Sequence, residues 1–122
     1  MKSVLLADDS AVVRKTLREI FETSGWSICA EACDGEEAVA KAQQLLPNVI
    51  VLDLSMPTMN GLTAGRILKV LLPKIPLILF TSFGKILSVA DLDGAGFSAL
   101  IDKNEAGKLV TTAQGLIDAA QQ

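Results

Sequence analysis

Histidine and tyrosine are missing from this chain of 122 residues, and aromatic residues make up only 4% of it. Without histidine, the chain supplies no imidazole base, no imidazole metal ligand and no imidazole that could carry a phosphoryl group. Ser-His-Asp and Cys-His catalysis are therefore excluded within this chain.

Cysteine is scarce as well, with only Cys29 and Cys33 present. In an extended strand, a spacing of four residues separates two side chains by about 13 Å, which is too far for a disulfide. No zinc-binding pattern surrounds the two residues. We therefore expect buried free thiols and a reducing compartment.

Long apolar runs are also lacking, and none approaches the length that crosses a membrane. The chain reaches Asp8 and Asp9 after only a few apolar residues, which is too short for a signal peptide. A formal net charge of -3 and a pI near 4.8 disfavour binding to nucleic acid or to an anionic membrane. We expect a cytoplasmic protein that binds neither.

Hydrophobic residues make up 50% of the chain, and its length is that of one domain, residues 1–122. Short apolar runs alternate with segments of helical periodicity. The predicted strands are Ser3–Ala7, Trp26–Cys33, Asn48–Leu52, Ile75–Phe80 and Phe97–Ile101. The predicted helices lie between the cap Ser10 and Gly25, over Ala38–Leu46, over Leu62–Leu72, from about Lys85 to Asp93, and after a cap at Asn104. This alternation predicts an α/β fold, a doubly wound parallel sheet of five strands with five helices. Five strand–helix units are too few for an eight-stranded barrel.

Polar residues stand where the predicted strands end. They are Asp8, Asp9, Asp53, Thr81 and Lys103. An aspartate after a strand is often only a helix cap. In an open parallel sheet, however, ligands bind at the carboxyl ends of the strands, and all five residues are expected at that edge.

Three carboxylates at one edge repel one another unless a cation neutralises them. Oxygen ligands without histidine or cysteine favour a hard cation, Mg²⁺ before others. One carboxylate can also attack a phosphoryl group. Lys103 and the hydroxyl of Thr81 would then hold the oxygens of the transferred group.

At these positions the sequence resembles the response-regulator receiver domains of two-component signalling, and in particular the chemotaxis regulators. The resemblance rests on Asp8-Asp9, the stretch from Asp53 to Gly61, Thr81-Ser82 and Lys103, and it covers essentially the whole chain. It implies a flavodoxin-like sheet of order 2-1-3-4-5. It also implies a regulatory domain that is not an enzyme and promotes only its own phosphorylation and dephosphorylation.

The resemblance further implies a role for each site residue. Asp53 would accept the phosphoryl group from the phospho-His of a sensor histidine kinase or phosphotransfer protein. Asp9, Asp53 and the backbone carbonyl of Ser55 would bind Mg²⁺ directly, and Asp8 would act mainly through water. Lys103 and Thr81 complete this expected site.

Two positions depart from the family pattern: Leu100 stands where an aromatic residue is usual, and Asn104 where proline is common. We expect output through the face formed by the fourth helix, fifth strand and fifth helix, binding a homodimer partner or a downstream target. Val89 and Leu92 are predicted to lie exposed on that face, because the apolar residues of the fourth helix spread over about 220°. No effector domain is expected in this chain.

Two other functions remain open at this stage. One is a small Mg²⁺-dependent aspartyl-phosphate phosphatase or phosphotransferase; against it, the second aspartate of a D-x-D motif is replaced by Ser55. The other is a phosphorylation-independent scaffold. The run from Gly94 to Ala99 matches the G-x-G-x-x-A sequence pattern of dinucleotide-binding loops. It precedes a predicted strand, whereas such a loop follows one, so the match is rejected. Arg14 and Arg18 are interpreted as part of a solvated face, with kinase docking as the alternative.

Overall fold

The computed structural model describes residues 2–84 and 87–120, without the side chain of Val89. Its strands form one parallel sheet in the order β2-β1-β3-β4-β5, which confirms the predicted topology. The strands are β1 Ser3–Ala7, β2 Ser27–Ala32, β3 Val49–Leu52, β4 Leu77–Thr81 and β5 Ala99–Asp102. The helices are α1 Ala11–Thr23, α2 Gly35–Leu45, α3 Gly61–Leu71, α4 Val89–Gly94 and α5 Leu109–Ala120, and a 3₁₀ segment spans Lys103–Lys108.

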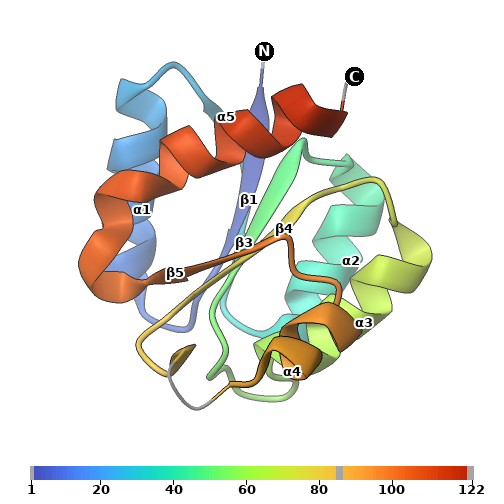
Figure 1. Cartoon of the computed structure of the whole chain (residues 1–122). Coiled ribbons are helices and arrows are strands. Elements are labelled where there is room, and N and C mark those ends of the chain that lie inside the picture. Colours follow the sequence, from blue (N-terminus) through green and yellow to red (C-terminus); the bar gives the residue numbers. More distant parts are fainter. Residues whose placement is uncertain (1, 85–86, 121–122) are drawn as a thin grey trace.

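Helices cover both faces of the sheet (Figure 1). Helices α1 and α5 lie on one face, where Leu17, Phe21 and Ile117 belong to the core. Helices α2 and α3 lie on the other, where Ala38 and Leu68 pack against the sheet. Because strands β1 and β3 are buried by both layers, their sequences are almost continuously apolar. Within the described ranges, no helix is long and apolar enough to cross a membrane.

Helices α1, α2 and α3 each begin with an N-cap side chain, which stands at the end of the loop leading out of the preceding strand. Ser10 accepts a hydrogen bond from Val13 N–H, Asp34 from Glu37 N–H, and Asn60 from Thr63 N–H. Each cap satisfies a backbone donor that the helix itself leaves unpaired. The loops on the carboxyl side of the sheet are thereby fixed close to the strand ends.

The fourth helix is shorter than the sequence pattern predicted. It begins at Val89, because Ser88 and Asp91 form a capping box that fixes its first turn. Leu87 precedes the helix, and the predicted start at Lys85 lies outside the described residues. Leu92 is half-buried, so the prediction that it faces solvent is wrong.

Two further local predictions are wrong. Asn104 does not cap the last helix: its N–H donates to Asp102, which caps the intervening 3₁₀ segment, and α5 starts only at Leu109. The two thiols are free as predicted, but they are not both buried. Cys29 is half-buried on β2, whereas Cys33 is exposed just after it.

Candidate functional site

The five site residues that were predicted at strand ends all stand at the carboxyl ends of the strands. Asp8 and Asp9 follow β1, Asp53 follows β3, Thr81 is the last residue of β4, and Lys103 follows β5. Parallel strands end at one edge of the sheet, so the topology brings these segments together.

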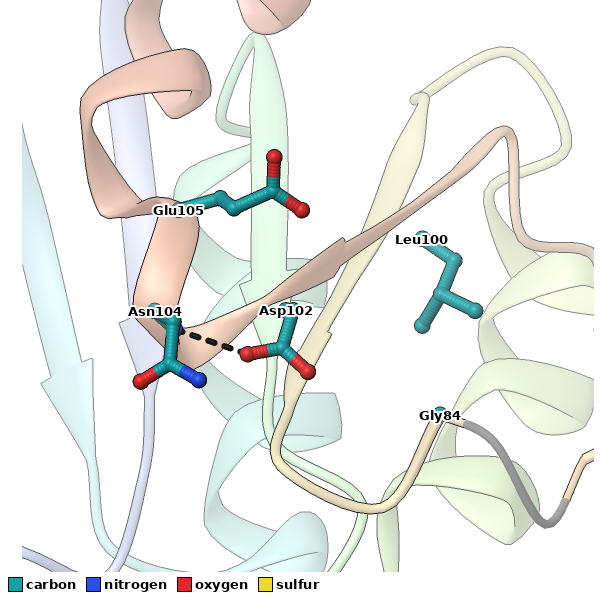
Figure 2. A pocket seen from close by; sticks show the side chains of 5 residues that line it. All are labelled: Gly84, Leu100, Asp102, Asn104 and Glu105. Carbon is teal, nitrogen blue, oxygen red and sulfur yellow. Dashed lines mark hydrogen bonds between the residues drawn. The ribbon is translucent and has the colours of Figure 1, made fainter.

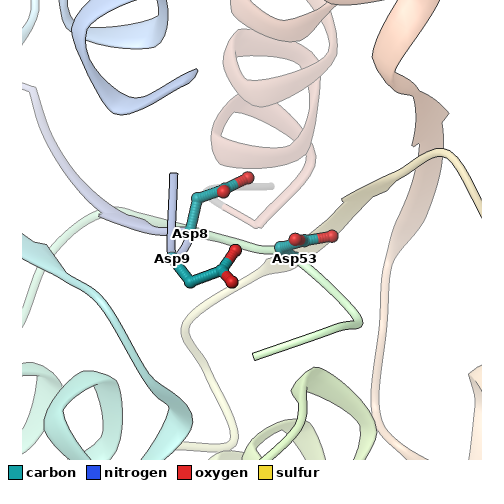
Figure 3. A group of neighbouring side chains, drawn as sticks. All are labelled: Asp8, Asp9 and Asp53. Atoms are coloured by element: carbon teal, nitrogen blue, oxygen red, sulfur yellow. The ribbon is translucent and has the colours of Figure 1, made fainter. Parts of the chain in front are cut away.

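The three aspartates form a compact acidic cluster, in which the carboxylates lie near one another and extend to the same side in the view of Figure 3. One carboxylate oxygen from each of Asp8, Asp9 and Asp53 lies within 4.8 Å of the others. Asp8 is 1% exposed and Asp53 4%, whereas Asp9 faces solvent. Two of the three charges are therefore held away from water, and their mutual repulsion is only weakly screened.

Lys103 supplies a positive charge to this cluster. Its Nζ lies 2.9 Å from Asp8 Oδ2 and 3.2 Å from Asp53 Oδ2. Burial alone lowers the pKa of Lys103, but hydrogen bonding and the charges of the two aspartates outweigh it, so that the pKa is raised. Burial, and then the charge of Asp8, raise the pKa of Asp53, and Lys103 offsets only part of that rise.

The cluster fits a divalent cation. Three carboxylates face one ammonium group, so negative charge remains in excess. Among the described residues, the buried Oδ1 of Asp53 has no hydrogen-bond partner, and Oδ2 of Asp8 has only its ion pair with Lys103. Buried carboxylate oxygens without donors are suitable ligands for Mg²⁺, which prefers oxygen.

Thr81 is fully buried at the end of β4. Its Oγ1 accepts a hydrogen bond of 3.2 Å from Phe83 N–H, while the hydroxyl keeps its own hydrogen for donation. The turn after β4 thus fixes the hydroxyl oxygen at the same edge of the sheet as Asp53.

The loop after Asp53 is tied back to the site through two glycines. Gly61 N–H donates to the carbonyl of Leu54 and Gly35 N–H to the carbonyl of Met59, both at 2.9 Å. A side chain on Gly61 would overlap the carbonyl of Asp53, so the close approach requires glycine here. Ser55 is exposed in this loop, and its predicted role as a carbonyl ligand stays a prediction.

Sequence reasoning missed a supporting network behind Asp8. Arg14 Nη1 donates a 2.7 Å hydrogen bond to the backbone carbonyl of Asp8, and its Nε lies 3.3 Å from Glu31. Arg18 binds the other carboxylate oxygen of Glu31 at 2.5 Å. Arg14 is therefore not part of a merely solvated face. The signal was hidden because only the pairing of Leu6 with Glu31 between β1 and β2 brings these residues together.

The order of the sheet, with an acidic cluster beside a lysine at its carboxyl edge, is typical of a class of signalling domain. Sequence comparison identifies the same class. The family profile described as "Response regulator receiver domain" matches residues 4–114. The chain therefore belongs to the receiver domains of two-component response regulators.

Individual relatives refine this assignment. The chain is similar to the chemotaxis protein CheY of Thermotoga maritima, with 33% identity over 102 residues that cover 84% of this chain and 85% of that protein. It is 43% identical over 82 residues to a protein-glutamate methylesterase/protein-glutamine glutaminase of Archaeoglobus fulgidus. That match covers 67% of this chain and only 23% of the methylesterase, so the likeness to such proteins concerns a part of their length.

Solved structures show the same fold. CheY in the CheX-CheY-BeF3-Mg²⁺ complex of Borrelia burgdorferi superposes with a TM-score of 0.88 at 30% identity, covering 94% of this chain and 88% of that one. The response regulator domain of Thermotoga maritima CheB gives 0.77 at 28% identity, covering 100% and 95%. The fold prediction is confirmed.

Proposed function

We propose that this chain is a phosphoacceptor domain in which Asp53 takes a phosphoryl group from the phospho-His of a sensor histidine kinase or phosphotransfer protein. The observation that carries the proposal is the state of Asp53 itself. Its carboxylate is buried, is held on one oxygen by Lys103, and has no hydrogen-bond partner among the described residues on the other. A carboxylate oxygen forms the new bond to phosphorus while the bond from phosphorus to the donor's imidazole nitrogen breaks, and that nitrogen keeps the electron pair.

Asp8, Asp9, Asp53 and the backbone carbonyl of Ser55 would hold Mg²⁺, with Asp8 acting mainly through water. The bound ion would offset the negative charge that gathers on the phosphoryl oxygens. The donor set supports this role, because every candidate ligand is an oxygen and three of the ligands are neighbouring carboxylates. In the CheY structure from Borrelia burgdorferi, the named complex includes BeF3 and Mg²⁺.

Lys103 and Thr81 would receive the phosphoryl oxygens. Lys103 stays protonated because the two aspartates raise its pKa, and a phosphoryl group on Asp53 would give the ammonium a further anionic partner. The hydroxyl of Thr81 donates its hydrogen from the end of the adjacent strand. Both groups thus hold charge that appears only on transfer.

Output would pass through the face of α4, β5 and α5, to a second copy or a downstream target. Leu100 is 38% exposed on β5 and leans toward Gly84, where an added Cβ would meet its side chain at 3.1–3.4 Å (Figure 2). Phe83 is 50% exposed in the preceding turn. Leu92 is half-buried, so among the described side chains Leu100 and Phe83 are the large apolar ones most exposed at this face.

The free thiols Cys29 and Cys33 support a cytoplasmic location, because a reducing compartment keeps thiols unpaired. We also assign the domain a regulatory role without turnover of a free substrate, and no direct binding of nucleic acid or membrane.

The test is incubation with acetyl phosphate and Mg²⁺, followed by intact mass measurement. The wild type is expected to gain one phosphoryl group, and Asp53→Asn none. Asp93→Asn, which changes an exposed aspartate on α4, is the matched control and is expected to behave as wild type.

Other outcomes would overturn the proposal. Phosphorylation of Asp53→Asn at the wild-type rate would show that the acceptor is elsewhere. Continuous release of phosphate from an added phosphomonoester would favour the phosphatase, and no reaction at all would favour the scaffold.

A further inference from the structure

Acidic residues are distributed very unevenly along the chain. From Ala38 to Ala90, the only acidic residue is Asp53, and the other thirteen of the fourteen lie outside this stretch. Asp53 itself is buried at the carboxyl edge of the sheet. The same stretch contains five basic residues, namely Lys41, Arg66, Lys69, Lys74 and Lys85. A chain of net charge -3 therefore contains a long segment of opposite charge.

Four exposed aliphatic residues lie in this segment, at the C-terminal ends of α2 and α3. Leu46 is 61% and Val70 78% exposed, and Leu45 and Leu71 are 44% and 45% exposed. Helices α2 and α3 are neighbours that each return from the carboxyl edge, so both end at the edge opposite the acidic site (Figure 1). We call these four residues the α2–α3 patch.

The α3 half of the patch has a hollow and basic side chains beside it. Arg66, Ile67, Val70 and Leu71 line a surface hollow of about 310 Å³. Arg66 and Lys74 are exposed, and none of the ion pairs found among the described residues includes either. Toward α4, Lys69 Nζ donates to the carbonyl of Asp93 at 3.1 Å, which marks the limit of the patch on that side.

We propose that the α2–α3 patch binds an amphipathic helix with acidic flanks, supplied by another protein. The apolar stripe of such a helix would cover the four aliphatic side chains and place one of its own in the hollow. Its carboxylates would meet Arg66 and Lys74 at the border, where complementary charge guides encounter and orientation.

Other occupants fit less well. Two copies joined symmetrically through this patch would place Arg66 and Lys74 of both chains in one interface, where like charges repel. Nucleic acid would leave the aliphatic side chains without a partner. An anionic membrane recruits clusters of about four to eight basic residues, whereas only Arg66 and Lys74 border this patch.

The test uses a synthetic amphipathic helix of about five turns, with leucines along one side and glutamates flanking them. It is titrated into the isotope-labelled full chain without phosphoryl donor, while amide resonances are recorded. Shifts are expected at Leu46, Val70 and Leu71 and not at Asp53. Because no phosphorylation is involved, the result is independent of the proposed function.

Two exposed valines provide a matched pair of variants. Val70→Glu is expected to weaken peptide binding about tenfold, as for a central interface contact. Val12→Glu is the control, because Val12 on α1 is 76% exposed and lies outside the patch. The double variant Arg66→Glu, Lys74→Glu is expected to lose the glutamate peptide and to gain a lysine peptide of the same pattern.

Several results would overturn the proposal. One is the absence of shifts at the patch, and another is equal binding of a peptide with glutamine in place of glutamate. Sedimentation with phosphatidylserine vesicles that Val70→Glu abolishes would assign the patch to membranes. Self-association that Val70→Glu abolishes would assign it to a second copy.

Discussion

Strands β1 and β3 contrast with the α4–β5 segment, residues 89–102, in how firmly they are packed. Every residue of β3 and all but the first of β1 are buried. In β5 only Ile101 is buried, and none of the side chains that the structure describes in α4 is buried. Both regions reach the same acidic edge, β1 and β3 through Asp8 and Asp53, and β5 through Lys103.

This difference in packing indicates that the two regions have different roles. Elements with few buried apolar contacts open at low free energy, whereas core strands open only with the whole domain. The aspartates are therefore held on the firm strands, while Lys103 joins them from the loosely packed side. We therefore expect a change at the carboxylates to move the α4–β5 segment without unfolding β1 or β3.

Truncation of one aliphatic side chain in each region tests this contrast with the largest expected effect. Ile50→Ala is expected to lower the free energy of unfolding by about 3 kcal/mol, because Ile50 is fully buried on β3. Leu100→Ala is expected to change it by less than about 1 kcal/mol. The measurement is urea unfolding followed by the fluorescence of Trp26, which is buried against Phe21. Equal losses would remove the contrast.

Mg²⁺ should stabilise the folded domain by binding at the ends of β1 and β3, with Asp9 as one of its ligands. At about ten times its Kd, an ion that binds only the folded state adds about 1.4 kcal/mol to the free energy of unfolding. We expect this gain in the wild type and its loss in Asp9→Ala, because Asp9 is the exposed member of the acidic cluster. Asp93→Asn should keep the gain. A full Mg²⁺ effect in Asp9→Ala would exclude it as a ligand.

The pH dependence of the free energy of unfolding, measured without Mg²⁺, should show that the charge of Asp53 at the end of β3 is unfavourable. The pKa of Asp53 is raised in the folded state by burial and by Asp8, so the folded protein binds this proton more tightly than the unfolded chain. The contribution of Asp53 to stability therefore falls as pH rises from the unfolded pKa, about 3.9, through the folded one. Asp53→Asn is expected to be more stable than wild type at neutral pH, and equal to it in acid. A less stable variant at neutral pH would contradict this sign.

The smallest effect is expected behind Asp8. Arg14 and Arg18 both bind Glu31, but only Arg14 also donates to the carbonyl of Asp8. Arg14→Gln is expected to weaken Mg²⁺ binding a few-fold, because it loosens the backbone that presents Asp8 and Asp9. Arg18→Gln is the control and should bind as wild type in a titration followed by amide shifts. Equal weakening in both variants would assign the effect to Glu31 instead.

The sequence predicted the firm region better than the loose one, for physical reasons. Apolar runs that end in aspartate identify buried strands, and parallel strands bring their ends together, so the positions of Asp8 and Asp53 could be predicted. The predicted start of α4 was too early, because Leu87 continues an apolar helical pattern. The capping pair Ser88 and Asp91 was visible in the sequence and marks the true start.

Pairings across the sheet could not be predicted in the same way. Arg14 and Glu31 meet only through the register of β1 and β2, which local patterns do not specify. The exposure of Leu100 likewise depends on how β5 lies at the edge of the sheet.

Hydrogen–deuterium exchange of the chain before and after phosphorylation by acetyl phosphate and Mg²⁺ tests the different roles of the two regions most directly. Phosphorylation is expected to change exchange in the α4–β5 segment and in the turn at Phe83, while the amides of β1 and β3 keep their protection. Asp53→Asn should show no change under the same treatment. Altered protection in β1 and β3 with an unchanged α4–β5 segment would contradict the account.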